Sequence, residues 1–274
     1  MIGNIEGLIP LIAAVVFAAG NTAAYTGCGY INNRNTRLKY FLQGASVGFA
    51  LGCVWFLTGP AYSDGAGGVL GSAGKFIHTT LTVYAAVQTG IVVLGMAGST
   101  IHADGKGAAR AGKLFLGNFY LDENGLSGGI IQGLLRHTWE MPQSLIGHGY
   151  SQARNVFGHV SRVDFWNGAT FVSDENKGRE NGVSLGNFIA LNIDYKITGN
   201  FDEHALSTSI FRHEYGHTFD SRIFGWFYLF VIGIPSIISA AGTGNHAEYW
   251  TERRADRHAK KMKNQQRKSK IVSC

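Results

Sequence analysis

The sequence predicts an α+β protein in which a hydrophobic, glycine-rich and mainly helical N-terminal region precedes a globular domain of helices and strands. Three long apolar stretches occupy the first 112 residues, whereas short strand patterns and amphipathic helix patterns alternate from Lys113 onward. Charged residues make up 15% of the chain and aromatic residues 12%, the reverse of a disordered composition. We therefore expect a hydrophobic helical region over residues 1–112, a globular domain over 113–260 and a basic tail over 261–274.

The N-terminal region contains three apolar stretches, which are Gly7–Gly20, Phe41–Gly59 and Phe76–Gly98. A helix that spans a membrane needs roughly 20 mainly apolar residues, a length that the second and third stretches reach and the first approaches. Three glycines at intervals of four, Gly44, Gly48 and Gly52, would line one helix face and let a second helix approach closely. The region therefore predicts either membrane association or a soluble, glycine-rich helical layer.

The chain ends and the cysteines argue against several other classes. The segment Met1–Glu6 has no basic residue, so the sequence predicts no cleavable signal peptide. The net charge of +6 is concentrated in the tail from Arg253 to Lys270, which has no interleaved aromatic residues, so we expect no nucleic-acid partner. The three cysteines are scattered and form no C-x-x-C pair, so neither a disulfide framework nor a zinc–thiolate site is expected.

Periodic patterns in the globular domain predict helices and strands in mixed order. One helix is expected over Gly128–Leu145, with Pro142 near its end, and another from Ser207 to Arg222. The expected strands are His159–Trp166, Ala169–Val172 and Val183–Ile193.

Two further segments follow the second helix. The uncharged run Ile223–Gly242 contains Pro235 and three glycines, and it predicts a buried loop or a broken helix. A last helix is expected to begin near Asn245, because Asn245 and Glu248 match a capping box.

The segment Arg212–His217 contains the motif H-E-x-x-H, formed by His213, Glu214 and His217. Residues four apart share one face of a helix, so both imidazoles can bind the same metal ion while Glu214 reaches a water on that ion. Zinc lowers the pKa of such a water to about 7, which lets a carboxylate take its proton at neutral pH. We therefore predict a Zn²⁺ site with His213 and His217 as ligands and Glu214 as the general base.

A catalytic zinc of this kind needs a third protein ligand. Asp220 and Ile223 occupy the positions where a metzincin has glycine and histidine, so that form is excluded. Glu252 and Asp256 lie four apart on the last helix, so Glu252 can complete the ligand set and Asp256 can hydrogen-bond a ligand histidine. The other candidate third ligands are His246, Glu248, Asp220 and His258. The candidate stabilisers of the transition state are Tyr249, His246 and Tyr228.

At these residues the chain resembles a group of bacterial zincin-like domains found at the C-termini of Rhs or YD-repeat toxin proteins. The resemblance covers roughly residues 113–260. It rests on the motif helix and on four further segments, which are Gly225–Leu229, Gly233–Ala241, Gly182–Ile189 and Gly117–Leu121 leading into His137–Glu140. It implies a bacterial metallopeptidase, membrane-associated or exported as an effector or toxin, although the chain contains no Rhs core.

A narrower resemblance involves the segment Glu252–Ala259, which is similar to the E-x-x-A-D-x-x-A block of CAAX prenyl peptidases and related membrane metallopeptidases. Both resemblances imply a gluzincin-type site with His213, His217 and Glu252 as ligands. They also imply a zincin-like fold, in which an active-site helix packs on a small mixed sheet and one edge strand binds the substrate backbone. The expected edge-strand residues are Val183, Ser184, Leu185, Gly186 and Asn187.

The function that the sequence predicts is therefore zinc-dependent hydrolysis of peptide bonds, by a zinc-bound water that Glu214 activates, in a protein or peptide substrate. Two alternatives stay open. In one, residues 1–112 act on a membrane, as a pore-forming or membrane-embedded toxin module, and the zinc is structural. In the other, the domain is an inactive zincin-like binding module.

Overall fold

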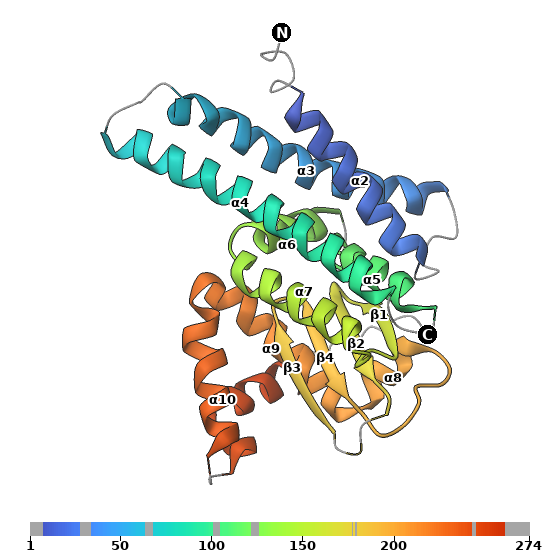
Figure 1. The fold of residues 1–274 in the computed structure, drawn as a ribbon. Coiled ribbons are helices and arrows are strands. Elements are labelled where there is room, and N and C mark those ends of the chain that lie inside the picture. Colours follow the sequence, from blue (N-terminus) through green and yellow to red (C-terminus); the bar gives the residue numbers. More distant parts are fainter. Residues whose placement is uncertain are drawn as a thin grey trace, which may run out of the picture. The chain divides into compact units, whose positions relative to one another are not determined.

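The computed structural model describes residues 8–27, 34–63, 68–100, 105–121, 126–176, 178, 180–242 and 245–260. The described part is a mixed α+β structure, mostly helical, with a four-stranded sheet (Figure 1). It divides into two compact units, Met1–Leu134 and Leu135–Cys274, and each is described by itself. Two sequence predictions lie outside the described residues: the basic tail 261–274 and the N-terminal segment Met1–Glu6.

Helices make up the described part of the first unit. They are α2 (Ile9–Gly27), α3 (Arg34–Ser63), α4 (Gly68–Ser99), α5 (Gly107–Leu116) and the start of α6 (Leu126–His137). The helices α2, α3 and α4 cover most or all of the three apolar stretches of the sequence, and each is long and apolar enough to cross a membrane. Only 6% of the apolar segment Gly71–Ser99 of α4 is buried, so most of its apolar side chains are not covered by the described part of the chain.

The glycines of α3 form the contact with α2. A Cβ atom on Gly44 would overlap with the backbone oxygen of Phe17, and one on Gly48 would overlap with that of Ala13. A Cβ atom on Gly52 would lie 2.6 Å from the Cα atom of Pro10. The prediction from the glycine spacing, that a second helix approaches this face closely, is therefore confirmed.

The first unit extends beyond residue 112, where the sequence analysis placed the domain boundary. The turn after α5 packs on α2, because the Phe119 ring lies edge-on to Phe17 at 5.1 Å and the Tyr120 ring lies 4.9 Å from Tyr25. These aromatic contacts tie residues after α5 to the apolar helices, and the structural boundary falls after Leu134.

The second unit contains a mixed sheet with the strand order β1-β2-β4-β3. Its strands are β1 (Arg162–Trp166), β2 (Ala169–Asp174), β3 (Asn181–Leu185) and β4 (Phe188–Asn192). The β1–β2 and β3–β4 pairs are antiparallel, whereas β2 and β4 run parallel with Val172 opposite Ala190. This order leaves β3 at one edge of the sheet.

The prediction of a single strand over Val183–Ile193 was wrong. The segment forms two antiparallel strands, β3 and β4, joined by a two-residue turn at Gly186 and Asn187. Gly186 has φ +64°, and a Cβ atom there would overlap with Ser144, so only glycine fits this turn. The pair Gly186 and Asn187 interrupts the apolar pattern, and its turn chemistry favours a hairpin over one continuous strand.

The prediction of one helix over Gly128–Leu145 was also wrong. Two helices occupy this region, α6 and α7 (Met141–Val156), and Pro142 lies in the first turn of α7. Proline is favoured there because its missing N–H would have no partner inside the helix in any case. Pro142 therefore marks the start of a helix and not its end.

Two helices cover opposite faces of the sheet. Along β4 the side chains alternate, so that the Phe188 ring stacks on His148 of α7 at 5.4 Å. Its neighbour Ile189 joins the core on the other face, which includes Phe211 and Tyr215 of α9 (Ser209–Phe224). A short helix, α8 (Phe201–Ser207), precedes α9 and closes one end of this core.

The uncharged run after α9 is a broken helix, in agreement with one of the two forms that the sequence predicted. It comprises η1 (Gly225–Phe227), η2 (Leu229–Gly233) and α10 (Ile234–Ala241), and the axis turns by 118° between Ser209–Phe227 and Leu229–Ala241. Gly225 makes the break possible, because its φ of +50° and its contact with the Trp139 ring exclude a side chain.

The last helix covers residues 250–260, so its predicted start near Asn245 was wrong. The expected capping box does not form. Asn245 instead precedes a single 3₁₀ turn, η3 (His246–Glu248), and its side chain makes no capping hydrogen bond.

Candidate metal centre

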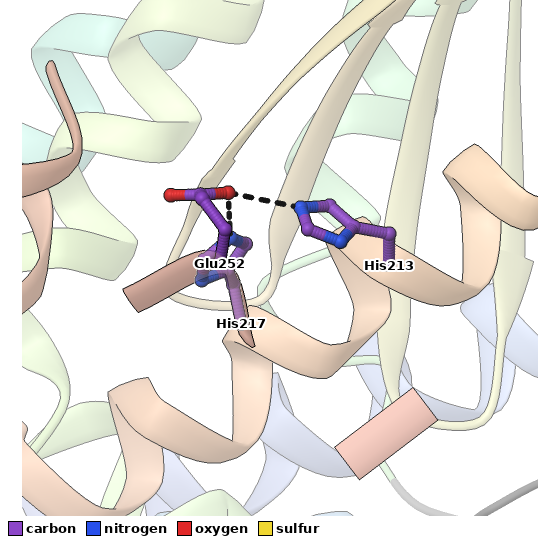
Figure 2. A group of neighbouring side chains, drawn as sticks. All are labelled: His213, His217 and Glu252. Atoms are coloured by element: carbon purple, nitrogen blue, oxygen red, sulfur yellow. Dashed lines mark hydrogen bonds and ion pairs between the residues drawn. The ribbon is translucent and has the colours of Figure 1, made fainter. Parts of the chain in front are cut away.

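Helix α9 presents different residues on its two sides. Phe211 and Tyr215, four apart, are buried in the core against the sheet. His213 and His217, also four apart, point away from that core and toward the helix over residues 250–260 (Figure 2). Packing of the aromatic pair therefore sets the direction in which the histidine pair points.

The two helices that carry the site approach each other very closely. A Cβ atom on Gly216 would overlap with the backbone carbonyl of Ala255. A glycine inside this helix predicts the close approach of another backbone or of a substrate, and the structure shows a backbone. The contact brings Glu252, three residues before Ala255 on the same helix, to the histidines.

His213, His217 and Glu252 converge on one point (Figure 2). The Oε2 atom of Glu252 lies 3.0 Å from Nε2 of His213 and 3.4 Å from Nε2 of His217. All three ligand atoms lie within 4.8 Å of one another, so this group could hold a metal ion. His213 keeps 25% of its side-chain surface exposed, while His217 and Glu252 keep 8% and 5%. The site is therefore open to solvent on the His213 side.

The second oxygen of Glu252 is held by hydroxyl groups. Ser236 of α10 donates a hydrogen bond to Oε1 at 2.6 Å, and Thr251 donates another at 2.9 Å. Burial alone would raise the pKa of Glu252, but hydrogen bonds from His213, His217 and Ser236 outweigh it and hold the pKa well below its usual range. Glu252 is therefore a carboxylate with one oxygen fixed and the other directed at the histidines.

His213 is oriented from its other ring nitrogen. Its Nδ1 atom lies 2.8 Å from Oδ1 of Asp256, one turn after Glu252. Burial lowers the pKa of His213, but hydrogen bonds with Glu252 and Asp256, together with the charge of Glu214, raise it to about 9. Asp256 thus contacts a candidate ligand histidine from outside the cluster, where the sequence analysis expected it.

His217 faces a carboxylate as well. Its Nδ1 atom and Oδ2 of Asp220 are both buried, 4.0 Å apart, and neither has a hydrogen-bond partner among the described residues. Asp220 is fully buried, and its other oxygen binds Arg254 and lies 3.4 Å from His258. These contacts place Asp220 and His258 behind the cluster rather than in it.

Glu214 lies on the side of α9 that faces the edge strand β3. Its carboxylate accepts a hydrogen bond from Ser184 Oγ at 2.7 Å and is 6% exposed. A Cβ atom on Gly182 would overlap with the same carboxylate, so the missing side chain makes room for it. Ser184 was expected to bind substrate, but in the structure it holds the candidate general base.

The edge-strand prediction is modified in two ways. The strand β3 ends at Leu185, so Gly186 and Asn187 belong to the turn. The backbone oxygen of Ser184 accepts a hydrogen bond from the buried Tyr228 hydroxyl at 2.9 Å. Tyr228 is therefore engaged with the strand, and that carbonyl is not free to pair with a substrate.

Other predicted residues lie near the cluster or outside it. His246 Nε2 is 3.8 Å from Glu252 Oε1, and its Nδ1 atom is 3.1 Å from Ser239 Oγ. Tyr249 and Glu248 are exposed and belong to no cluster of candidate metal ligands among the described residues. The roles of Ser236 and Ser184 as carboxylate partners were not predicted, because only tertiary packing brings them to Glu252 and Glu214. Thr251, next to Glu252 in the sequence, was also missed.

Comparisons with protein-family models, with curated proteins and with solved structures found no match for this chain. The functional argument therefore rests on the geometry of the site.

Proposed function

We propose that the chain is a zinc-dependent metallopeptidase of the gluzincin type. The observation that carries the proposal is the convergence of His213, His217 and Glu252, with the carboxylate of Glu214 held on the neighbouring strand. A tetrahedral zinc ion bound at about 2.0–2.1 Å holds its ligand atoms about 3.3 Å apart. The measured separations of 3.0 and 3.4 Å lie close to that value, and two nitrogens with one carboxylate oxygen are a donor set that zinc accepts.

A zinc ion held by His213, His217 and Glu252 would supply a water of lowered pKa and would polarise a peptide carbonyl. Glu214 would serve as the general base, and Ser184 keeps its carboxylate in one orientation. Asp256 fixes the ring of His213 from behind, and the buried carboxylate of Asp220 lies 4.0 Å from Nδ1 of His217. The partly exposed His213 marks the side from which a peptide enters.

The test compares the wild type with the Glu214→Gln variant, which keeps the shape of the side chain but cannot accept the proton. We expect about one zinc ion per chain in both proteins, and a loss of cleavage of an unfolded protein by roughly 10²–10⁴-fold in the variant. Equal cleavage by both proteins would remove Glu214 from the mechanism. Absence of zinc from both, under conditions free of chelators, would overturn the proposal.

A second candidate function is a membrane-acting module in which the metal is structural. The observation that favours it is the set of three helices long and apolar enough to span a bilayer. Leakage of dye from vesicles to which the protein is added separates the two functions. If the chain acts on the membrane and the metal is structural, the Glu214→Gln variant should release dye as fast as the wild type. The same variant would be inactive if peptide hydrolysis is the function.

A further inference from the structure

A row of large apolar side chains is exposed next to the candidate metal centre. Phe230, Ile234, Ile237 and Ile238 are 69%, 47%, 70% and 66% exposed. They lie on the broken helix, in a run from residue 223 to 242 that contains no charged residue. Apolar surface costs about 25 cal/mol per Å² to leave in water, so an exposed row of this size indicates a binding surface. We call these four residues the α10 face.

The α10 face is held in place by the opposite side of the same helix. Ser236 and Ser239, three apart, point toward the metal centre and bond to Glu252 and His246. Ile232 and Tyr228 are buried, and Tyr228 is hydrogen-bonded to the edge strand. One side of the helix therefore supports a candidate metal ligand, and the other side is apolar and exposed.

Three features of the same chain match this surface to a lipid bilayer. The first is the presence of three helices long and apolar enough to span a membrane. The second is a set of exposed aromatic side chains of the kind that collects at membrane interfaces, namely Trp226, Tyr249 and Trp250. The third is the exposed basic stripe at Arg253, Arg257 and Lys260 on the adjoining helix, which suits anionic headgroups.

We propose that the α10 face is a membrane anchor that inserts into one leaflet beside the metal centre. The arm Leu229–Ala241 is about 20 Å long at 1.5 Å per residue, which is too short to cross a hydrocarbon core of about 30 Å. The preceding arm, Ser209–Phe227, cannot enter the membrane with it, because α9 packs on the sheet through Phe211 and Tyr215. The insertion is therefore parallel or oblique to the surface, as in other one-sided anchors.

The anchor has a consequence for the substrate, which rests on the proposed peptidase function. Ser236 lies 2.6 Å from Glu252 on the same helix that carries the α10 face. Since a helix with its side chains is about 10–12 Å across, the metal centre would lie within that distance of the lipid. The substrates are then protein segments whose cleavage sites lie at the bilayer surface.

The insertion is tested by placing an environment-sensitive fluorophore on single cysteines in the full chain. The native cysteines are replaced by alanine, and the protein is reconstituted in vesicles of phosphatidylcholine and phosphatidylglycerol. The labelled variants are Ile237→Cys and Phe230→Cys. Leu94→Cys, 72% exposed on α4, serves as the lipid control, and Glu203→Cys, exposed on α8, serves as the water control.

We expect the two labels on the α10 face to show blue-shifted emission and to be quenched by lipids that carry nitroxides on their acyl chains, as at Leu94. Emission and quenching equal to those at Glu203 would overturn the proposal. A blue shift without quenching by the lipids would also overturn it, because a protein, such as a second copy of the chain, would then cover the face.

The substrate class is tested separately with Ile237→Lys. The assay uses one peptide in two forms, tethered to the vesicle membrane and free in solution. A charge in the apolar layer of a membrane is costly, so we expect Ile237→Lys to cleave the tethered form about tenfold more slowly and the free form at an unchanged rate. Phe157→Lys, at a position 70% exposed elsewhere in the unit, is the matched control. Equal loss on both peptides would refute the substrate class. Lipid quenching without cleavage of either peptide by the wild type would leave the anchor standing and refute the peptidase.

Discussion

At the residue scale, the carboxylate of Asp256 orients the ring of a candidate ligand histidine, His213. Asp256 lies 2.8 Å from Nδ1 of His213, although half of its own side-chain surface is exposed to solvent. Removal of the charge in Asp256→Asn leaves a hydrogen-bonding group of the same shape. Partners of this kind typically contribute 10–100-fold to metal affinity, and we expect zinc affinity to fall by about that factor.

Zinc affinity is measured by competition with a chromophoric chelator. Glu248→Gln, which removes an exposed carboxylate four residues before Glu252, is the control and should leave the affinity unchanged. Equal affinities of Asp256→Asn and the wild type would show that Asp256 does not orient the ligand.

A different histidine makes stability depend on pH. His148 is fully buried against Phe188, and burial lowers its pKa from 6.5 to about 4. Between these two values the unfolded chain binds a proton that the folded chain does not, so stability falls as the pH drops from about 6.5 to about 4. The loss from this residue amounts to about 3 kcal/mol.

The measurement is the thermal unfolding midpoint of the second unit as a function of pH. In His148→Phe, whose side chain does not titrate, the acid slope should be smaller than in the wild type. His159→Asn, at a position with 51% of its side chain exposed, should keep the wild-type slope. An unchanged slope in His148→Phe would contradict the assignment.

The candidate ligands could be predicted from the sequence because they follow helix periodicity. His213 and His217, and likewise Glu252 and Asp256, are four apart, so each pair shares a helix face before any tertiary structure is known. The partners Ser236 and Ser184 carry no such signal. Their positions depend on how α10 and β3 pack around the cluster.

At the level of elements, the approach of α9 to the helix over residues 250–260 assembles the site. The contact depends on Gly216, where a Cβ atom would overlap with the Ala255 carbonyl. We expect Gly216→Ala to push the last helix away, to lower stability by about 1–3 kcal/mol and to weaken zinc binding, because Glu252 moves with that helix.

Unfolding midpoints and zinc titration check this prediction together. The control is Gly112→Ala in α5, where no other atom lies within 4 Å of the added Cβ, and where alanine should stabilise the helix by up to about 1 kcal/mol. If Gly216→Ala bound zinc and unfolded like the wild type, the close approach would not be needed for the site.

Element boundaries were predicted less well than element types, for a physical reason. Apolar residues flank Gly186 and Asn187 in Val183–Ile193, and only this two-residue turn signal separates the two strands. In the same way, a proline such as Pro142 is compatible with the end of one helix or the start of the next. Here it lies in the first turn of α7, which packs on the sheet. The long apolar helices needed no such decision, because their composition alone predicts them.

At the level of the whole molecule, charges around the apolar helices predict an orientation in the membrane. Basic residues flank the connection between α2 and α3, at Arg34, Arg37 and Lys39, and follow α4 at Lys106, Arg110 and Lys113. The connection between α3 and α4 contains Asp64, and Lys75 lies one to two turns into α4. If all three helices span, the two basic groups lie on one side, which the positive-inside rule assigns to the cytoplasm.

We therefore expect the second unit, with its metal centre, to lie on the cytoplasmic side. A membrane-impermeant maleimide applied to intact cells should label Asp64→Cys but should label Glu203→Cys only after permeabilisation, in a chain whose native cysteines are replaced by alanine. Labelling of both positions in intact cells would place the metal centre outside, and release of the protein by alkaline carbonate would rule out spanning helices. The cytoplasmic result would in turn limit the substrates of the proposed peptidase to segments on the inner face of the membrane, the leaflet that the α10 face must then enter.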